Sequence, residues 1–200
     1  GIATLYMTEL IEAGYPVFIP EYRGYGPNPG FPSSEGLMKD GIGIDKYAQK
    51  LAQANHGGHI VLLAHSLGSG IAIDMASKFN YYGLILISPF TSIKDAAPDW
   101  AMNFIKDEFD NLKKMPLVDE PMMILHGVQD RVVKYDLGFQ LFLAARKNAA
   151  FIKIDNAGHR PAPKHLIAYS LDAIKDFRRD MSFPRLRRRA STMPNIEVLI

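Results

Sequence analysis

The sequence predicts an α/β protein whose doubly wound, mostly parallel sheet carries helices on both faces. Short aliphatic runs alternate along the chain with longer stretches of helical spacing, which is typical of βαβ units. The runs at 60–63 and 84–87 are apolar at every position, as expected when helices cover both faces of a sheet. The chain has 200 residues, which is enough for one domain with a substantial core.

Each expected element follows from a local pattern. Helices are predicted where apolar residues recur every three or four positions, strands where short apolar runs end at turn residues, and a loop where glycine and proline cluster. These patterns predict, in chain order, a helix at 3–13, a strand at 16–21, a loop at 24–32, a helix at 36–55, a strand at 59–64, a helix at 69–79, strands at 82–88, 121–126 and 149–154, and a closing helix at 164–179.

Ser66 stands where an apolar strand is expected to turn into a helix, in the segment Ala-His-Ser-Leu-Gly. Ala64 and Gly68 are small, which would let strand and helix cross closely while Ser66 holds a strained backbone with its hydroxyl exposed. This is a variant of the G-x-S-x-G turn that presents a nucleophilic serine. A serine that only starts a helix is the alternative interpretation.

Two candidate partners follow in loops after later strands, Asp130 beyond the strand at 121–126 and His159 beyond the strand at 149–154. The carboxyl ends of parallel strands meet at one edge of a sheet, where ligands bind, so we expect Ser66, Asp130 and His159 to come together. A turn role for Asp130 remains open. Asp155 and His126 are rivals for a polar role near His159, and we interpret Asp155 as a loop or supporting residue and His126 as structural.

With these residues the chain resembles the α/β hydrolase superfamily, in the serine branch of small esterases, thioesterases, acylglycerol lipases and serine aminopeptidase-like hydrolases. The order Ser, Asp, His matches, and so do the segments Glu-Tyr-Arg-Gly-Tyr-Gly at 21–26 and Ser-Ser-Glu-Gly at 33–36. The resemblance implies a catalytic triad of Ser66, Asp130 and His159. It also implies that the Leu67 amide forms part of an oxyanion hole.

The resemblance also implies strands ahead of the first helix that this chain lacks. In the family, the third of them lies between the strands expected here at 16–21 and 59–64, so we expect a gap in the sheet. Buried strand edges without partners would cost on the order of 1–3 kcal/mol per amide. We therefore expect the natural protein to be longer, with Gly1 as a possible end of the loop that supplies a second oxyanion donor.

The segment 89–120 is long for a connection, and family members use this region as a cap over the substrate. One helical face, formed by Ala101, Ile105, Phe109 and Leu112, is expected to pack in the core. Three further apolar side chains then remain as candidates for an acyl-binding pocket, namely Trp100, Met102 and Phe104.

Composition excludes several other functions. The net charge is only +2, and basic residues do not interleave with aromatic ones, so no nucleic-acid partner is expected. Cysteine is absent, which excludes disulfides and thiolate metal sites and fits a cytoplasmic location. His56 and His59 lie without acidic neighbours, and we interpret them as loop residues, so neither a metal nor another cofactor is expected. No apolar run reaches the roughly 20 residues of a membrane helix.

Residues 182–200 differ from the domain at 1–181. Arg185, Arg187, Arg188 and Arg189 form a basic patch, which we interpret as a solvated tail that could contact an anionic membrane surface.

The function predicted from the sequence is serine hydrolysis of an acyl ester or thioester on a small-molecule or lipid substrate. An acyltransferase with the same three residues and a non-catalytic binding or scaffold protein remain as alternatives.

Overall fold

The computed structural model describes residues 8–54, 58–97, 109–145, 149–177 and 196–199. Residues 8–12 are helical. The further elements, in chain order, are β1 (Val17–Phe18), α2 (Ser34–Ala54), β2 (His59–His65), α3 (Leu67–Ala76), β3 (Gly83–Ile87), α4 (Ile93–Ala96), α5 (Asn111–Lys114), the 3₁₀ turn Met115–Leu117, β4 (Met122–Gly127), α6 (Tyr135–Ala144), β5 (Ala149–Ile154), α7 (Pro163–Phe177) and β6 (Ile196–Leu199). None of the helices within these ranges is long and apolar enough to cross a membrane.

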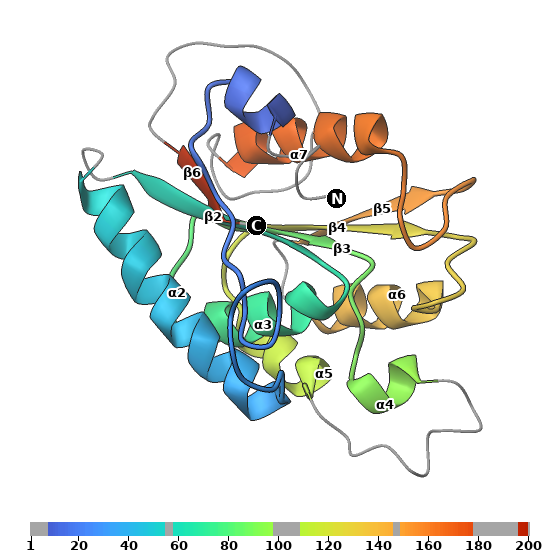
Figure 1. Cartoon of the computed structure of the whole chain (residues 1–200). Coiled ribbons are helices and arrows are strands. Elements are labelled where there is room, and N and C mark those ends of the chain that lie inside the picture. The colour runs from blue at the N-terminus through green and yellow to red at the C-terminus, as the bar shows by residue number, and fades with distance from the viewer. Residues whose placement is uncertain (1–7, 55–57, 98–108, 146–148, 178–195, 200) are drawn as a thin grey trace.

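The strands form one sheet in the order β1-β6-β2-β3-β4-β5, and each neighbouring pair is parallel. Helices α2, α3, α5 and α6 lie on one face, whereas α7 and the short helix at 8–12 lie on the other (Figure 1). The register places His65 beside Ile87 and Ile87 beside Leu125. The carboxyl ends of β2, β3 and β4 therefore lie level with one another. The predicted fold class, a mostly parallel sheet covered on both faces, is confirmed.

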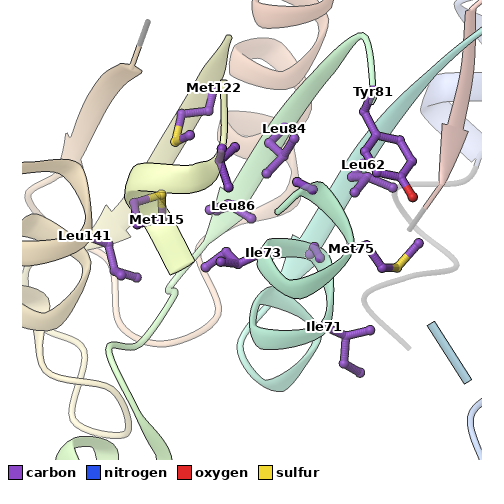
Figure 2. Packing of buried hydrophobic residues seen from close by; sticks show 14 of the residues in the cluster. Leu62, Ile71, Ile73, Met75, Tyr81, Leu84, Leu86, Met115, Met122 and Leu141 are labelled. Atoms are coloured by element: carbon purple, nitrogen blue, oxygen red, sulfur yellow. The ribbon is translucent and has the colours of Figure 1, made fainter. Parts of the chain in front are cut away.

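Alternate side chains of each central strand enter two separate parts of the core. In β2, Leu62 packs with the cluster beneath α2, α3 and α5, while Val61 and Leu63 pack with the cluster beneath α7. Figure 2 shows part of the first cluster, to which β3 contributes Leu84 and Leu86, α3 contributes Ile73, and the 3₁₀ turn contributes Met115. Burial on both faces explains why these strands are apolar at every position.

Helix α2 packs on the sheet through residues spaced at helical intervals. Its buried positions include Leu37, Gly41, Ala48 and Ala52, which follow one another at spacings of four or seven residues and so share one face. The Ser33 hydroxyl accepts a hydrogen bond from the Gly36 amide at 3.1 Å. This bond satisfies one of the amides that lack an intrahelical partner at a helix start.

The expectation of a gap in the sheet is wrong for this structure. Strand β6 occupies the position between β1 and β2 and pairs with both, with Val198 opposite Val17 on one side and Val61 on the other. Residues 196–199 therefore belong to the sheet of the domain and not to a solvated tail. The Arg-rich residues 185–189 lie outside the described residues.

Phe109 packs in the core as expected and is 4% exposed, but it does not share a helical face with Leu112. Phe109 is not helical and has a φ of 55°, and its ring lies at 6.1 Å from that of Phe90 in the core. Leu112, in α5, is 40% exposed. The positive φ of Phe109 lies two residues before the start of α5, so Phe109 and Leu112 do not belong to one continuous helix. Ala101 and Ile105 lie outside the described residues.

A buried carboxylate joins α3 to α5. The Asp74 side chain is 3% exposed, and its two oxygens accept hydrogen bonds from Lys78 at 2.6 Å and Lys114 at 2.7 Å. Lys78 lies two residues beyond the end of α3, whereas Lys114 is the last residue of α5. Asp74 is thus the shared anion that holds the two helices in register.

We predict that Asp74→Ala lowers the free energy of unfolding by about 1–3 kcal/mol, because it leaves the half-buried Lys114 ammonium without its counter-charge. Urea denaturation measures this change. The matched control is Asp172→Ala, which removes an exposed pair with Lys175 at 3.7 Å and should change stability by less than about 0.5 kcal/mol. Equal losses in the two variants would contradict the anchoring role of Asp74.

Candidate active site

Ser66 occupies a strained turn between β2 and α3. Its φ of 53° and ψ of −119° lie outside the regions that residues with a Cβ normally adopt. The turn is held by its main chain, since the Ser66 amide donates to the Ile87 carbonyl at 2.9 Å and the Ser66 carbonyl accepts from the Ser69 hydroxyl at 2.6 Å. Strain of this kind persists only where the surrounding structure fixes it, as it does at many functional sites.

The two small residues around Ser66 contribute less to close packing than the sequence suggested. A Cβ placed on Gly68 would lie 3.9 Å from the Ala64 Cβ, which is an ordinary contact. At Gly70, two residues after Gly68, a Cβ would lie 2.7 Å from the Phe109 ring and 3.1 Å from the Phe90 ring. The close approach in α3 is therefore made at Gly70, against the aromatic core.

Asp130 lies in the loop that follows β4 and is 7% exposed. Its Oδ1 accepts hydrogen bonds from the amides of Val132 and Val133, both at 2.9 Å, and its Oδ2 lies 2.9 Å from Nδ1 of His159. Burial by itself would raise the pKa of Asp130, but the hydrogen bonds from His159 and from the two amides outweigh it and hold the pKa below its ordinary value. Asp130 is thus a buried carboxylate that stays ionised.

His159 lies in the loop after β5 and completes a line of three side chains. Its Nε2 is 2.9 Å from the Ser66 hydroxyl, and its Nδ1 faces Asp130 as described above. This loop is joined to the loop that follows β4, since the Gln129 amide donates to the Ala157 carbonyl at 2.9 Å. A Cβ on Gly127 would collide with the carbonyls of Ala157 and Gly158. The absence of a side chain at Gly127 therefore allows the loop to come this close.

The rivals of His159 have other partners. His126 is fully buried, and its Nε2 lies 3.0 Å from the Val133 carbonyl and 3.4 Å from Oδ2 of Asp130. Burial lowers the pKa of His126, so it is neutral and Nε2 donates to the carbonyl. Asp155 is exposed and pairs with Lys153 at 2.7 Å. His126 supports the Asp130 loop, and Asp155 belongs to the surface.

Sequence reasoning missed two side chains beside His159. His65 and Ser88 both contact the main-chain carbonyl of His159, at 2.8 Å and 3.5 Å. The sequence could have indicated them only by their positions, since His65 ends β2 and Ser88 directly follows β3 at the same edge of the sheet.

Of the other predicted site residues, Leu67 begins α3, and the first amides of a helix have no intrahelical acceptor. Trp100, Met102 and Phe104 lie outside the described residues.

In the described part of the chain, no group of three or more His, Cys, Asp or Glu side chains could hold a metal ion. His59 is exposed and stacks on Tyr82 with ring centroids 4.5 Å apart, and His56 lies outside the described residues. The side chains that the structure brings into line at this edge of the sheet are a hydroxyl, an imidazole and a carboxylate.

Comparison with known proteins identifies the family. The model of the family described as serine aminopeptidase, S33, matches residues 3–114, which is more than half of the chain. The chain belongs to this family of α/β hydrolases. The resemblance inferred from the sequence is confirmed.

Two curated relatives have similar sequences. The chain is 28% identical over 162 residues to alpha/beta hydrolase domain-containing protein 17B of Xenopus laevis, covering 80% of this chain and 55% of that protein. It is 29% identical over 165 residues to the 17C protein of Mus musculus, covering 80% of this chain and 50% of the relative. The chain thus spans about half the length of the curated relatives it matches.

Solved structures share the fold. An esterase of Pyrococcus furiosus has a TM-score of 0.68 at 16% identity, with 90% of this chain and 75% of that one covered. A monoacylglycerol lipase of Paleococcus ferrophilus has a TM-score of 0.63 at 17% identity, with 78% and 82% covered. At these identities the likeness concerns the fold alone.

We predict that Ser66→Gly is more stable than Ser66→Ala by about 1 kcal/mol, although both lose the hydroxyl. Glycine relieves roughly 1–3 kcal/mol of backbone strain at a positive φ, and its greater freedom in the unfolded chain offsets about 0.4–1 kcal/mol of that gain. Denaturant unfolding of the two variants measures the difference. At Ser77, where φ is −72°, the order should reverse and alanine should be favoured by about 0.5–1 kcal/mol; the same order at both positions would mean that Ser66 is not strained.

We also predict that His126 makes the fold sensitive to acid. Its folded pKa lies below the ordinary value, so below about pH 6.5 the unfolded chain binds the proton first and stability falls as the pH falls, by at most about 1.4 kcal/mol per pH unit. His126→Gln removes the titrating group and keeps a donor near the Val133 carbonyl. The loss of stability between pH 7 and pH 5 should therefore be smaller in this variant, as measured by urea denaturation, and unchanged in the exposed control His59→Gln. An unchanged loss in His126→Gln would overturn the assignment.

Proposed function

We propose that this protein is a serine hydrolase that cleaves an acyl ester or thioester through an acyl-enzyme intermediate. One observation carries the proposal: Nε2 of His159 lies 2.9 Å from the Ser66 hydroxyl while its Nδ1 lies 2.9 Å from Asp130. Each distance is within hydrogen-bond reach, which is the geometric requirement for a base that activates a nucleophile and is oriented by a third group. Membership of a hydrolase family supports the same reaction class.

In the proposed reaction, Nε2 of His159 accepts the proton of the Ser66 hydroxyl as the serine oxygen attacks the acyl carbonyl. The imidazolium then gives this proton to the departing alcohol or thiol, which leaves the acyl group on Ser66. A water molecule, deprotonated by the same nitrogen, attacks the acyl carbon of the acyl-enzyme. The bond from this carbon to the Ser66 oxygen then breaks, the imidazolium returns its proton to that oxygen, and the carboxylic acid is released. Asp130 stabilises the imidazolium and keeps Nδ1 protonated, a role for which an ionised and buried carboxylate is suited.

The Leu67 amide is the proposed donor to the oxyanion of the tetrahedral intermediate. It is the first amide of α3 and directly follows the nucleophile, which is the position that this donor takes in strand-turn-helix sites. Loss of one donor of this kind typically costs about 10²–10³ in rate.

The acyl group is proposed to be apolar. Trp100, Met102 and Phe104 are the candidate lining of its pocket, in a segment whose flanking elements, α4 and α5, lie on the same face of the sheet as α3 (Figure 1). The solved neighbours include a protein titled an esterase and one titled a monoacylglycerol lipase, which makes an ester of a small molecule or lipid the first substrate class to test. The reaction as written needs no cofactor. The Arg-rich segment at 185–189 is a candidate contact for an anionic membrane surface.

The test is covalent labelling with a fluorophosphonate probe, read by intact mass and peptide mapping. We expect one label on Ser66, no label in Ser66→Ala, and a labelling rate lowered by about 10⁴ in Asp130→Asn, because His159 then loses the partner that fixes its tautomer. Ser77→Ala is the matched control, since Ser77 bonds only within the end of α3, and should label at the original rate. The proposal would be refuted if the folded, unchanged chain did not label, or if the Ser66→Ala variant still labelled. Either result would favour a binding protein on a hydrolase fold.

A further inference from the structure

The main-chain carbonyl of His159 is held by side chains from two other strand ends. Nε2 of His65 lies 2.8 Å from this oxygen, and the Ser88 hydroxyl lies 3.5 Å from it. The rings of His65 and His159 are 4.9 Å apart and tilted by 43°. The proposed general base is therefore contacted at its ring by Ser66 and Asp130, and at its main chain by His65 and Ser88.

These two contacts come from rigid parts of the fold. His65 is the last residue of β2 and pairs with Ile87 of β3. Ser88 is fully buried, has a φ of 47°, and donates its amide to the Leu125 carbonyl of β4 at 2.9 Å. His159, by contrast, lies in a loop between β5 and α7. The contacts therefore tie a loop residue to the central strands of the sheet.

The direction of the bond from His65 follows from its chemistry. Burial lowers the pKa of His65, so its imidazole is neutral, with one nitrogen that donates and one that accepts. The carbonyl oxygen of His159 can only accept a hydrogen bond. The proton of His65 must therefore be on Nε2, and this nitrogen donates to His159.

We propose that His65 is a positioning residue that, by donating from Nε2 to the His159 carbonyl, fixes the main chain from which the His159 ring reaches Ser66. The proposal rests on the serine hydrolase function inferred above. Asp130 fixes the ring at Nδ1, whereas the bond from His65 acts on the main chain of the same residue. Small displacements of a reacting group cost rate steeply, about 10²-fold for 1 Å, so a bond that pins the main chain contributes to turnover without touching substrate.

The test compares two substitutions at His65. In His65→Gln the side-chain amide nitrogen can take the place of Nε2 and donate to the same carbonyl, whereas His65→Leu has similar bulk and no donor. We expect His65→Leu to lower the fluorophosphonate labelling rate of Ser66, and kcat for an acyl ester, by about 10-fold or more with KM unchanged. His65→Gln should stay within about 3-fold of the original chain. The matched control is His59→Leu, at the other end of the same strand, which should label at the original rate.

A second measurement does not depend on activity. Long-range ¹H–¹⁵N spectra report the ring nitrogens of His159, whose shifts should move in His65→Leu and return in His65→Gln. Equal rate losses in both His65 variants, no loss in either, or His159 shifts that are the same in all chains would overturn the proposal. Absence of labelling in the unchanged chain would refute the hydrolase function instead, and the spectra would then decide whether His65 positions His159.

Discussion

The burial of one ionised carboxylate, that of Asp130, is the constraint on which the site depends. A charged group that is 7% exposed is tolerated only where hydrogen bonds replace the water it has lost. The amides of Val132 and Val133 saturate Oδ1, which leaves Oδ2 to face His159. The loop after β4 thus adopts the one conformation that satisfies the charge, and that conformation also fixes the direction in which the carboxylate can act.

The parallel register of the sheet brings the remaining groups to the same place. β2, β3 and β4 end level with one another, so the residues just beyond them share one edge. Two of these residues, Ser66 and Ser88, have a positive φ, which turns the chain sharply off the sheet. The strain at this edge is supported by the apolar core beneath it, where Ile85, Ile87 and Leu125 are fully buried.

The local sequence pattern predicted most helices and strands, because the apolar spacing that defines each of them lies within a short stretch of the chain. The strand predicted at 149–154 coincides with β5, and those predicted at 59–64 and 121–126 agree with β2 and β4 within one residue, since continuous apolar runs have clear ends. Strand β6 was not predicted, because its four residues are too few to give a local strand pattern and pair only with residues far away in the sequence. Ser66, Asp130 and His159 were predicted to meet from strand ends alone. The contacts of His65 and Ser88 with His159 were not, because a hydrogen bond to a main-chain oxygen requires no particular residue type in its partner.

The place of β6 affects how the domain can assemble. Among the described strands, β1 is joined to the sheet through β6, and Val17 lies opposite Val198. This pairing closes a loop of nearly the whole chain, and contacts between such distant residues form late because the entropy of closure must be met first. During folding, β1 and the adjacent edge of β2 therefore stay without this partner until β6 docks between them. An unpaired strand edge can pair with another chain, so a folding intermediate in which β6 has not yet docked is more open to unwanted strand pairing than the folded domain.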